Sequence, residues 1–291
     1  MTRTRPLAIA ACLAALCAAA LPARAADTEK KLGWTDAAEL GYVVTSGNTE
    51  TSTFGLKNTL ARDWERSRFE INLGAIRVKT TDQSLYAVGS PGDFEVVDGD
   101  PTVTAENYYL NGRYDRKITD RFFWFAGAGW DRNRFAGIDS RYTGFSGVGN
   151  IWIDTERRKW KTDYAVSGTK ESDVVEPADF DGTFVGARLS STFLEKFSAT
   201  GSYGNDTIVD ENLNDTSDLR VNMTNWVSLN MSTHLALKVS LQWLYDRQPA
   251  LKEVDLFAPP GPPTVTVPTQ KVVTEVDSLD SIFTTALVIK Y

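Results

Sequence analysis

The chain has 291 residues, 11% of them aromatic and 42% apolar, and its formal net charge is −7 because 38 Asp and Glu outnumber 31 Lys and Arg. This acidic balance argues against a nucleic-acid-binding protein, which needs a basic face to replace the counterions of phosphates. One His and two Cys leave little material for a metal site, and we expect no cofactor. The mean hydropathy is −0.27, and only one apolar run is long. A helical membrane protein is therefore excluded, because each spanning helix needs about 20 mostly apolar residues.

Residues 1–25 have the pattern of a secretory signal peptide that is cleaved before Ala26. Arg3 and Arg5 give a positive start, Leu7 to Leu21 form an apolar stretch, and Ala23-Arg24-Ala25 provides a small-x-small cleavage site. We therefore expect the secretion translocon to be a partner during export.

Both cysteines, Cys12 and Cys17, lie inside this signal segment. The tetrapeptide that ends at Cys12 loosely resembles a lipoprotein cleavage box, but the apolar run before it is too short and continues past it. We predict that the exported domain, residues 26–291, has no cysteine and is held together without disulfides.

The predicted domain alternates apolar and polar residues along twelve segments, which is typical of strands with two different faces. The segments cover residues 35–45, 53–63, 69–75, 107–114, 124–131, 141–153, 160–169, 183–193, 196–203, 219–229, 235–243 and 279–291. Most are longer than the five or six residues usual in globular strands and match the roughly 9–11 that a tilted membrane-spanning strand needs. The even number also fits bacterial barrels. We predict an all-β fold: a transmembrane, antiparallel, up-and-down β-barrel of about 12 strands.

The connections between these segments favour the same fold. From the second onward, short turns alternate with longer segments, as expected for a barrel with tight periplasmic turns and longer external loops. The predicted external connections hold 21 acids and 5 bases; they are 46–51, 80–105, 131–140, 171–181, 205–218 and 246–271. In the last of these, Pro259 to Pro263 would stiffen the chain and keep it from extending the sheet.

Acidic residues are densest in the predicted external loop 205–218. Its carboxylates are Asp206, Asp210, Glu211, Asp215 and Asp218. Calcium prefers such oxygen ligands, but the spacing does not match an EF-hand loop. We expect a solvated acidic loop beside lipopolysaccharide bridged by divalent cations, and no protein metal site.

Two sets of side chains follow from the predicted faces. Candidate lumen-lining residues carry mixed charge: Glu39, Lys57, Glu70, Arg113, Lys161, Asp163, Arg188, Lys238 and Lys290. They could line a solute path or form an ion-paired plug, and with 12 strands we favour a narrow or partly occluded lumen. Tryptophans near strand ends predict an aromatic girdle at the two membrane interfaces: Trp34, Trp64, Trp124, Trp130, Trp152, Trp160 and Trp243.

The chain ends on a strand with an aromatic last residue. Phe283, Leu287, Ile289 and Tyr291 form a pattern that resembles the assembly signal of outer-membrane proteins, although an ordinary closing strand also alternates. The expected partners are the barrel-assembly machinery, outer-membrane lipid and lipopolysaccharide, with no nucleic acid.

Three stretches resemble the domain-of-unknown-function family 481, which is labelled a salt-induced outer membrane protein. They are Gly33-Trp34 through Glu39-Leu40-Gly41 to Thr45-Ser46-Gly47-Asn48-Thr49-Glu50, then Gly147 to Glu156, and then Leu279 to Tyr291. Asn150 stands where the family more often has Tyr, and Tyr291 where it more often has Phe. The resemblance implies an outer-membrane barrel with no settled activity and no catalytic residues to assign.

We predict a narrow pore for small polar solutes or a structural envelope protein, and only the family label links either to salt stress. Two alternatives remain. A barrel enzyme acting on lipid or peptide would need a catalytic cluster, and the only His, His234, falls in a short inner turn where a solvated side chain is expected. A soluble periplasmic β-protein is the other alternative.

Overall fold

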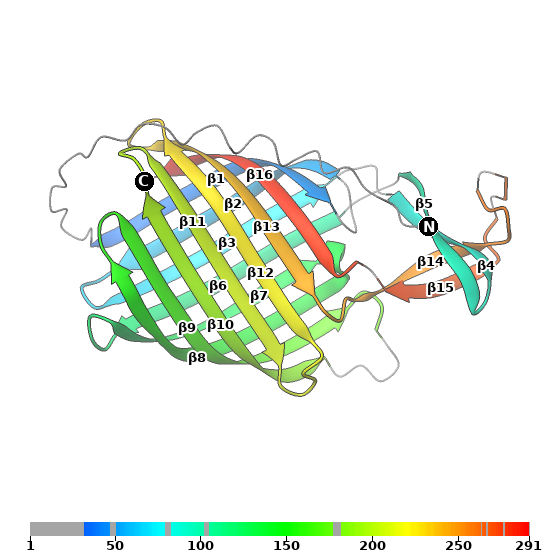
Figure 1. The fold of residues 1–291 in the computed structure, drawn as a ribbon, viewed down its shortest axis with the longest axis horizontal. Coiled ribbons are helices and arrows are strands. Elements are labelled where there is room, and N and C mark those ends of the chain that lie inside the picture. Colours follow the sequence, from blue (N-terminus) through cyan, green and yellow to red (C-terminus); the bar gives the residue numbers. More distant parts are fainter. Residues whose placement is uncertain are drawn as a thin grey trace.

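The computed structural model contains a closed barrel of twelve antiparallel strands and a separate four-stranded sheet (Figure 1). It describes residues 32–46, 51–78, 83–101, 105–176, 182–262, 264–265, 267–275 and 277–290. The predicted signal peptide, turn residues 47–50 and Tyr291 lie outside the described residues. The predicted fold, a 12-stranded antiparallel barrel, is confirmed.

The barrel strands are longer than most of the predicted segments. They are β1 (Gly33–Ser46), β2 (Thr51–Asp63), β3 (Ser67–Val78), β6 (Ala105–Lys117), β7 (Phe122–Asn133), β8 (Ile138–Asp154), β9 (Arg158–Asp173), β10 (Thr183–Lys196), β11 (Gly201–Asn212), β12 (Leu219–Asn230), β13 (Leu235–Asp246) and β16 (Leu279–Lys290). The second sheet contains β4 (Gln83–Ser90), β5 (Asp93–Pro101), β14 (Leu251–Phe257) and β15 (Gln270–Glu275). Among the described residues, no helix is long and apolar enough to cross a membrane.

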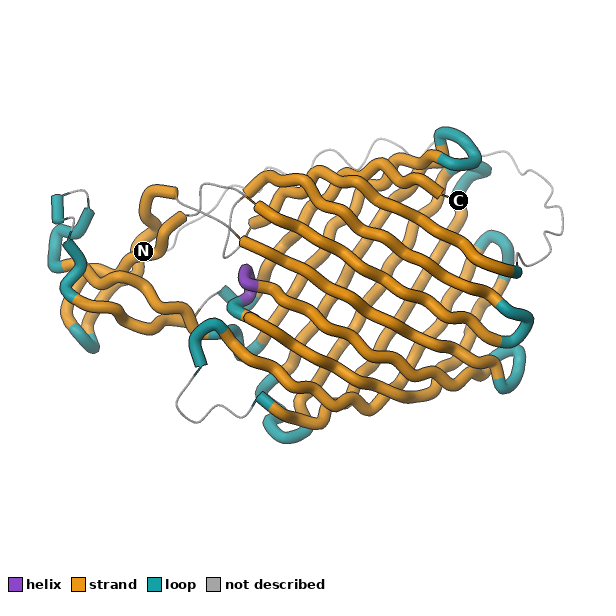
Figure 2. The backbone as a smooth tube through the Cα atoms, turned by 180° about the vertical axis from the view of Figure 1, so that it is seen from behind, coloured by secondary structure: helices purple, strands orange, loops and turns teal. Residues whose placement is uncertain are grey.

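The first and last barrel strands close the ring. β1 pairs with β16 from Ala37 opposite Lys290 to Ser46 opposite Ser281, and its other edge pairs with β2. Each barrel strand therefore has a partner on both sides, as the tube in Figure 2 shows. Closure removes the exposed edges of a sheet and satisfies its backbone groups internally, which a membrane-spanning sheet requires.

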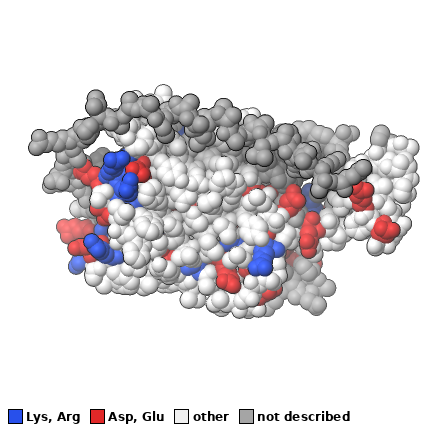
Figure 3. Space-filling model, in the orientation of Figure 1, with Lys and Arg blue, Asp and Glu red and all other residues white. Residues whose placement is uncertain are grey.

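Burial in the barrel strand β9 is inverted relative to a water-soluble protein. In β9, Asp163 is 3% exposed and Glu171 is 7% exposed, whereas Val166 is 61% exposed. On the face drawn in Figure 3, charged side chains gather toward the ends of the barrel and leave much of its middle uncharged. Polar groups inside and apolar groups outside are the arrangement of a barrel that faces lipid.

The two ends of the barrel differ, as the sequence predicts. At one end, which we call the turn end, neighbouring strands are joined by three or four residues: 64–66, 118–121, 155–157, 197–200 and 231–234. β16 also finishes there, where Lys290 donates its backbone N–H to the carbonyl of His234. At the opposite end, which we call the loop end, β9 and β10 are joined by residues 174–182, and the second sheet lies beyond it (Figure 1).

The prediction for residues 196–218 was wrong. The expected strand 196–203 and acidic loop 205–218 are instead a turn at 197–200, the strand β11 and a shorter loop at 213–218. The turn forms because the Ser198 hydroxyl oxygen accepts the backbone N–H of Gly201 at 2.7 Å. The polar residues after it read as a loop in the sequence, yet on β11 Asp206 and Asp210 lie on the inner face of the barrel and Asn205 bonds a neighbouring strand.

Two predicted loops, 80–105 and 246–271, contain most of the second sheet. β14 pairs in parallel with β4, which joins the two segments, and β5 and β15 form the edges in the order β15-β14-β4-β5. Ala87, Val254 and Leu256 form its buried core. The loop after β14 packs on β4, since a Cβ at Gly261 would lie 2.7 Å from a methyl of Val88. The proline-rich stretch that contains Gly261 therefore packs against the second sheet and is more than a stiff spacer in a loop.

Two glycines of β8 differ in the space that a side chain would have. A Cβ on Gly147 would lie 2.0 Å from the backbone oxygen of Tyr164, whereas a Cβ on Gly144 would meet nothing within 4 Å. We expect Gly147→Ala to destabilise the barrel by about 1–3 kcal/mol or more, because backbone must shift. Gly144→Ala is the matched control and should leave stability unchanged or slightly raised. Urea unfolding in detergent micelles measures both, and equal midpoints would contradict the close approach at Gly147.

Candidate functional site in the charged lumen

Ion pairs between strands that are not neighbours identify the side chains that face the interior of the barrel. Arg113 on β6 contacts Asp163 on β9 at 2.6 Å, although β7 and β8 separate these strands. Lys238 on β13 reaches Glu39 on β1 at 2.7 Å across β16. Such contacts can form only on the concave side of a curved wall, so these residues face the lumen.

The structure places the nine candidate lumen residues on this inner face. Four of them form the two ion pairs just described. Glu70 pairs with Arg68 at 2.7 Å, and Arg188 pairs with Asp210 at 2.6 Å. Lys290 lies at the turn end, where its Nζ donates to the Oδ1 of Asn230 at 2.8 Å. Lys57 and Lys161 make no ion pair among the described residues.

A turn-end cluster of charge joins the inner faces of β2, β3, β6 and β9. It consists of Asp63, Arg68, Glu70, Arg113, Asp115 and Asp163. Arg68 bridges Asp63 at 2.6 Å and Glu70 at 2.7 Å, and Arg113 contacts Asp115 at 2.7 Å as well as Asp163. Each arginine therefore forms ion pairs with two carboxylates. The Arg113–Asp163 pair links β6 and β9, which are not neighbours in the barrel.

A loop-end cluster is larger and was missed in the sequence. It consists of Asp131, Arg141, Glu171, Arg188, Asp210, Asp218, Arg220 and Asp246. Arg220 on β12 contacts Glu171 at 2.7 Å, Asp218 at 3.0 Å and Asp246 at 3.4 Å. Arg141 adds a second contact to Glu171 at 3.0 Å. The alternation of residues in β12 could have placed Arg220 on the inner face. Its partners Glu171, Asp218 and Asp246, however, lie in segments that the sequence predicted as loops.

Inward-facing aromatic rings lie beneath lumen cations. The pairs, with the distance from the cation to the ring centroid, are Lys161 and Phe123 at 5.7 Å, Arg113 and Phe125 at 4.0 Å, Arg188 and Phe145 at 4.8 Å, Arg220 and Phe184 at 5.4 Å, and Lys238 and Trp226 at 5.3 Å. Glycines make room for some rings: a Cβ on Gly149 would lie 2.3 Å from Phe123 and one on Gly127 2.5 Å from Phe145. Cation–π contact and ring packing fill the lumen along the wall from β6 to β10.

A second group of inward-facing side chains, which we call the central belt, lies in the other half of the lumen. It consists of Glu39, Lys57, Tyr109, Asp206, Trp226 and Lys238. Tyr109 lies over Gly74, where a Cβ would be 2.3 Å from its ring, and Trp226 lies over Gly204 in the same way at 2.2 Å. The Trp226 indole N–H donates to the Oδ2 of Asp206 at 3.2 Å. Lys57 lies within electrostatic range of Tyr109 and also of Glu39 and Asp206. The belt brings cations, carboxylates and ring faces to one level of the barrel.

The residues predicted for the membrane interfaces and for assembly lie on the outer face. Trp34, Trp64, Trp124, Trp152 and Trp160 are all more than a third exposed. Trp130 and Trp243 are half-buried, and their strand register also turns them outward. On β16, Phe283, Leu287 and Ile289 alternate with the buried Ile282, Ala286 and Val288, so they point outward.

The acidic loop that remains, residues 213–218, is ordered by hydrogen bonds within the loop and from Gln248. The Ser217 hydroxyl donates to the Asp215 carboxylate at 2.6 Å, the Ser217 backbone N–H donates at 3.0 Å, and Gln248 donates at 3.2 Å. These donors, the Ser217 hydroxyl first, lower the pKa of Asp215. Within the described ranges no group of three or more His, Cys, Asp or Glu is arranged to hold a metal ion.

His234 lies exposed in the turn 231–234. Its Nδ1 is 2.9 Å from the Thr233 hydroxyl, and its backbone N–H donates to the Ser232 hydroxyl oxygen at 3.3 Å. These are short-range contacts within the turn, and none of them involves a carboxylate of the described residues. The geometry is that of a solvated turn residue rather than a base paired with a nucleophile.

A closed barrel with an ion-paired interior and an apolar outer wall belongs to the class of membrane-spanning β-barrels. The model of a family described as a protein of unknown function, DUF481, matches residues 38–256. The chain belongs to this family, which confirms the resemblance found in the sequence. The sequence matches no curated protein.

Solved structures resemble this chain at low sequence identity. The NanC porin has a TM-score of 0.51 and 8% identity, with 87% of this chain and 98% of that chain covered. An outer membrane channel from Pseudomonas putida F1 has a TM-score of 0.47 and 10% identity, with 90% and 97% covered. The KdgM porin has a TM-score of 0.43 and 6% identity, with 87% and 98% covered. The first of these supports a porin-like barrel, and none transfers a substrate.

Proposed function

We propose that this protein is a narrow channel for small polar solutes in the outer membrane of a Gram-negative bacterium. The observation that carries the proposal is the ion-paired interior, where carboxylates and guanidinium groups of β6, β9 and β12 meet, while exposed Val, Leu and Trp side chains cover the outer wall. A polar interior offers a water-compatible path, and the apolar exterior matches lipid. The NanC barrel, similar in fold, is a porin, which supports a transport role.

The channel is expected to be narrow because side chains bridge its lumen. The Lys238–Glu39 ion pair crosses the inner face of β16. It covers Ala286 and Val288 of that strand, which are 3% and 4% exposed. Aromatic rings fill the opposite wall. A 12-stranded barrel lies between the filled eight-stranded and the open 16-stranded types, so these bridges decide its free width. The alternative in this class, a closed structural envelope protein, would conduct no ions.

The orientation follows from the two ends. In barrels of this kind the short turns are periplasmic and the long segments external. The turn end would therefore face the periplasm, and the loop end with its second sheet would face outward. We propose that residues 1–25 are removed on export, and that the outward Phe283, Leu287 and Ile289 with the terminal Tyr291 are read by the barrel-assembly machinery.

Planar-bilayer recording of the refolded protein tests the channel and its ion preference. Carboxylates outnumber guanidinium groups in the loop-end cluster, so we expect a preference for cations. Asp210→Asn should lower the cation-to-anion permeability ratio about fourfold, because a unit charge about 10 Å from a passing ion shifts its energy by about 0.4 kcal/mol in water, with opposite signs for a cation and an anion. Glu195→Gln is the control, since Glu195 pairs with Arg158 on the outer face of the barrel at the turn end.

Two outcomes would count against this proposal. A folded, inserted barrel without conductance at any salt concentration would leave only the structural role. Conductance with an anion preference that Asp210→Asn does not change would contradict the role assigned to the loop-end cluster.

A further inference from the structure

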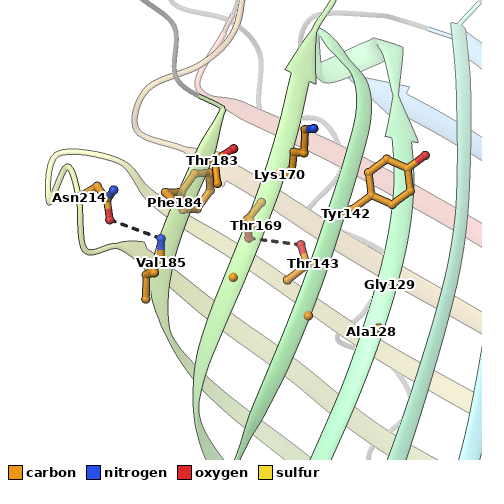
Figure 4. Close-up of a pocket in the computed structure, with 12 residues that line it drawn as sticks. Ala128, Gly129, Tyr142, Thr143, Thr169, Lys170, Thr183, Phe184, Val185 and Asn214 are labelled. Atoms are coloured by element: carbon orange, nitrogen blue, oxygen red, sulfur yellow. Dashed lines mark hydrogen bonds between the residues drawn. The ribbon is translucent and has the colours of Figure 1, made fainter.

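A groove crosses the outer, lipid-facing surface of the barrel near the loop end (Figure 4). It measures about 650 Å³ and runs over β7, β8, β9 and β10. Its floor is one row of register partners: Ala128 opposite Gly144, Gly144 opposite Gly168, and Gly168 opposite Val185. The volume falls within the range of about 300–1,000 Å³ typical of small-molecule sites.

The glycines of this row are not explained by the fold. A Cβ on Gly144 or on Gly168 would meet nothing within 4 Å, so neither allows a close approach within the chain. Neither residue has a positive φ angle. Glycine inside a strand weakens it, and a retained one often marks a place where a ligand approaches closely. The space above them is therefore available to something outside the barrel.

The rim of the groove toward the loop end carries one charge. Tyr142, Lys170 and Thr183 form the next row, with Lys170 opposite both of the others. Tyr142 is 58% exposed, and Lys170 is exposed without an ion pair or hydrogen bond among the described residues. Lys170 lies three residues before the end of β9, at the level where a lysine on a lipid-facing wall extends its ammonium to the headgroups.

We propose that this groove seats an acyl chain of a phosphorylated lipid from the external leaflet, with the lipid phosphate on the ammonium of Lys170. The inference rests on the membrane orientation proposed above. Among the described residues that line the groove there is no carboxylate and Lys170 is the single charged residue, so an anionic headgroup is favoured over a zwitterionic one. The apolar floor offers contact to a chain, and the Tyr142 phenol adds a donor at headgroup level.

Native mass spectrometry of the full mature chain tests the proposal. The protein is released from micelles that contain equal amounts of phosphatidylglycerol and phosphatidylcholine with identical chains. We expect one phosphatidylglycerol to be retained in at least tenfold preference. Gly144→Leu and Gly168→Val, which fill the groove, should each abolish retention, and Lys170→Gln should remove the preference between the two lipids.

Matched controls separate the groove from the rest of the lipid-facing wall. Ala38→Leu enlarges an outward residue of β1, and Arg158→Gln removes an exposed cation on the outer face at the turn end. Both should retain lipid like the parent. Equal retention by the parent and every groove variant would overturn the proposal, as would a dimer of the chain that Gly144→Leu dissociates without any lipid bound.

The same preparations are recorded in planar bilayers, so the two proposals can fail separately. Conductance with no lipid preference would overturn the lipid site and leave the channel standing. Lipid retention without conductance in the parent would overturn the channel alone.

Discussion

Replacing Arg220 by alanine is expected to destabilise the barrel by about 3–5 kcal/mol, because it removes one partner of a buried charge cluster. Arg220 is 19% exposed, and its partners Glu171 and Asp218 are only 5% and 7% exposed. Without the guanidinium, three carboxylates face one another at the loop end, and Glu171 keeps only Arg141. The guanidinium stacking on Phe184 at 5.4 Å is lost as well.

Urea unfolding of the protein refolded into vesicles measures this effect through the shift in midpoint. Arg158→Ala is the control, because Arg158 is 47% exposed and pairs with Glu195 at the turn end. Exposed pairs contribute little, so its midpoint should match the parent. Equal midpoints for both variants would mean that water or counterions hold the loop-end carboxylates as well as Arg220 does.

The fold could be predicted because the signals for it are local. In β13, Leu237 and Leu241 alternate with Lys238 and Gln242 without interruption, and the structure turns the first pair outward and the second inward. Short turns also alternate with longer connections for most strand pairs, although β7 and β8 are joined by only residues 134–137. These patterns need no knowledge of which strands are distant partners.

The site was harder to predict because its contacts join distant strands. Alternation placed Arg113 and Asp163 on the inner face, but only the closed ring brings them to 2.6 Å. Trp226 was missed because a large ring on a polar face breaks the simple pattern. Its signal is the small residue opposite, Gly204, which leaves room for the ring inside the barrel.

The second sheet could not be predicted for the same reason. Its central contact is the parallel pairing of β14 with β4, two segments separated by most of the barrel. Each segment alone is short and is interrupted by glycine and proline, so it reads as a loop. The acidic residues of β11 misled in another way, because Asp206 and Asp210 are polar for the lumen rather than for an external loop.

Replacing Val166 by arginine is expected to lower the stability of the barrel strongly if the outer wall faces lipid. The size of the loss distinguishes a membrane barrel from a soluble one. Val166 is 61% exposed and lies in the middle of β9, which runs from Arg158 to Asp173. An exposed valine of a soluble protein tolerates such a change within about 0.5 kcal/mol. On the lipid face of a barrel, arginine at the bilayer midplane costs about 2–4 kcal/mol.

Val174→Arg is the matched control, because Val174 is 53% exposed but lies just past the end of β9. Near or outside the interface the cost falls to about 0–1 kcal/mol, since the guanidinium stays hydrated. Both variants are refolded into vesicles and unfolded in urea beside the parent. A lower midpoint for Val166→Arg alone is expected. If both variants match the parent and the protein stays in solution without lipid, water rather than hydrocarbon surrounds this wall, and the soluble periplasmic alternative holds.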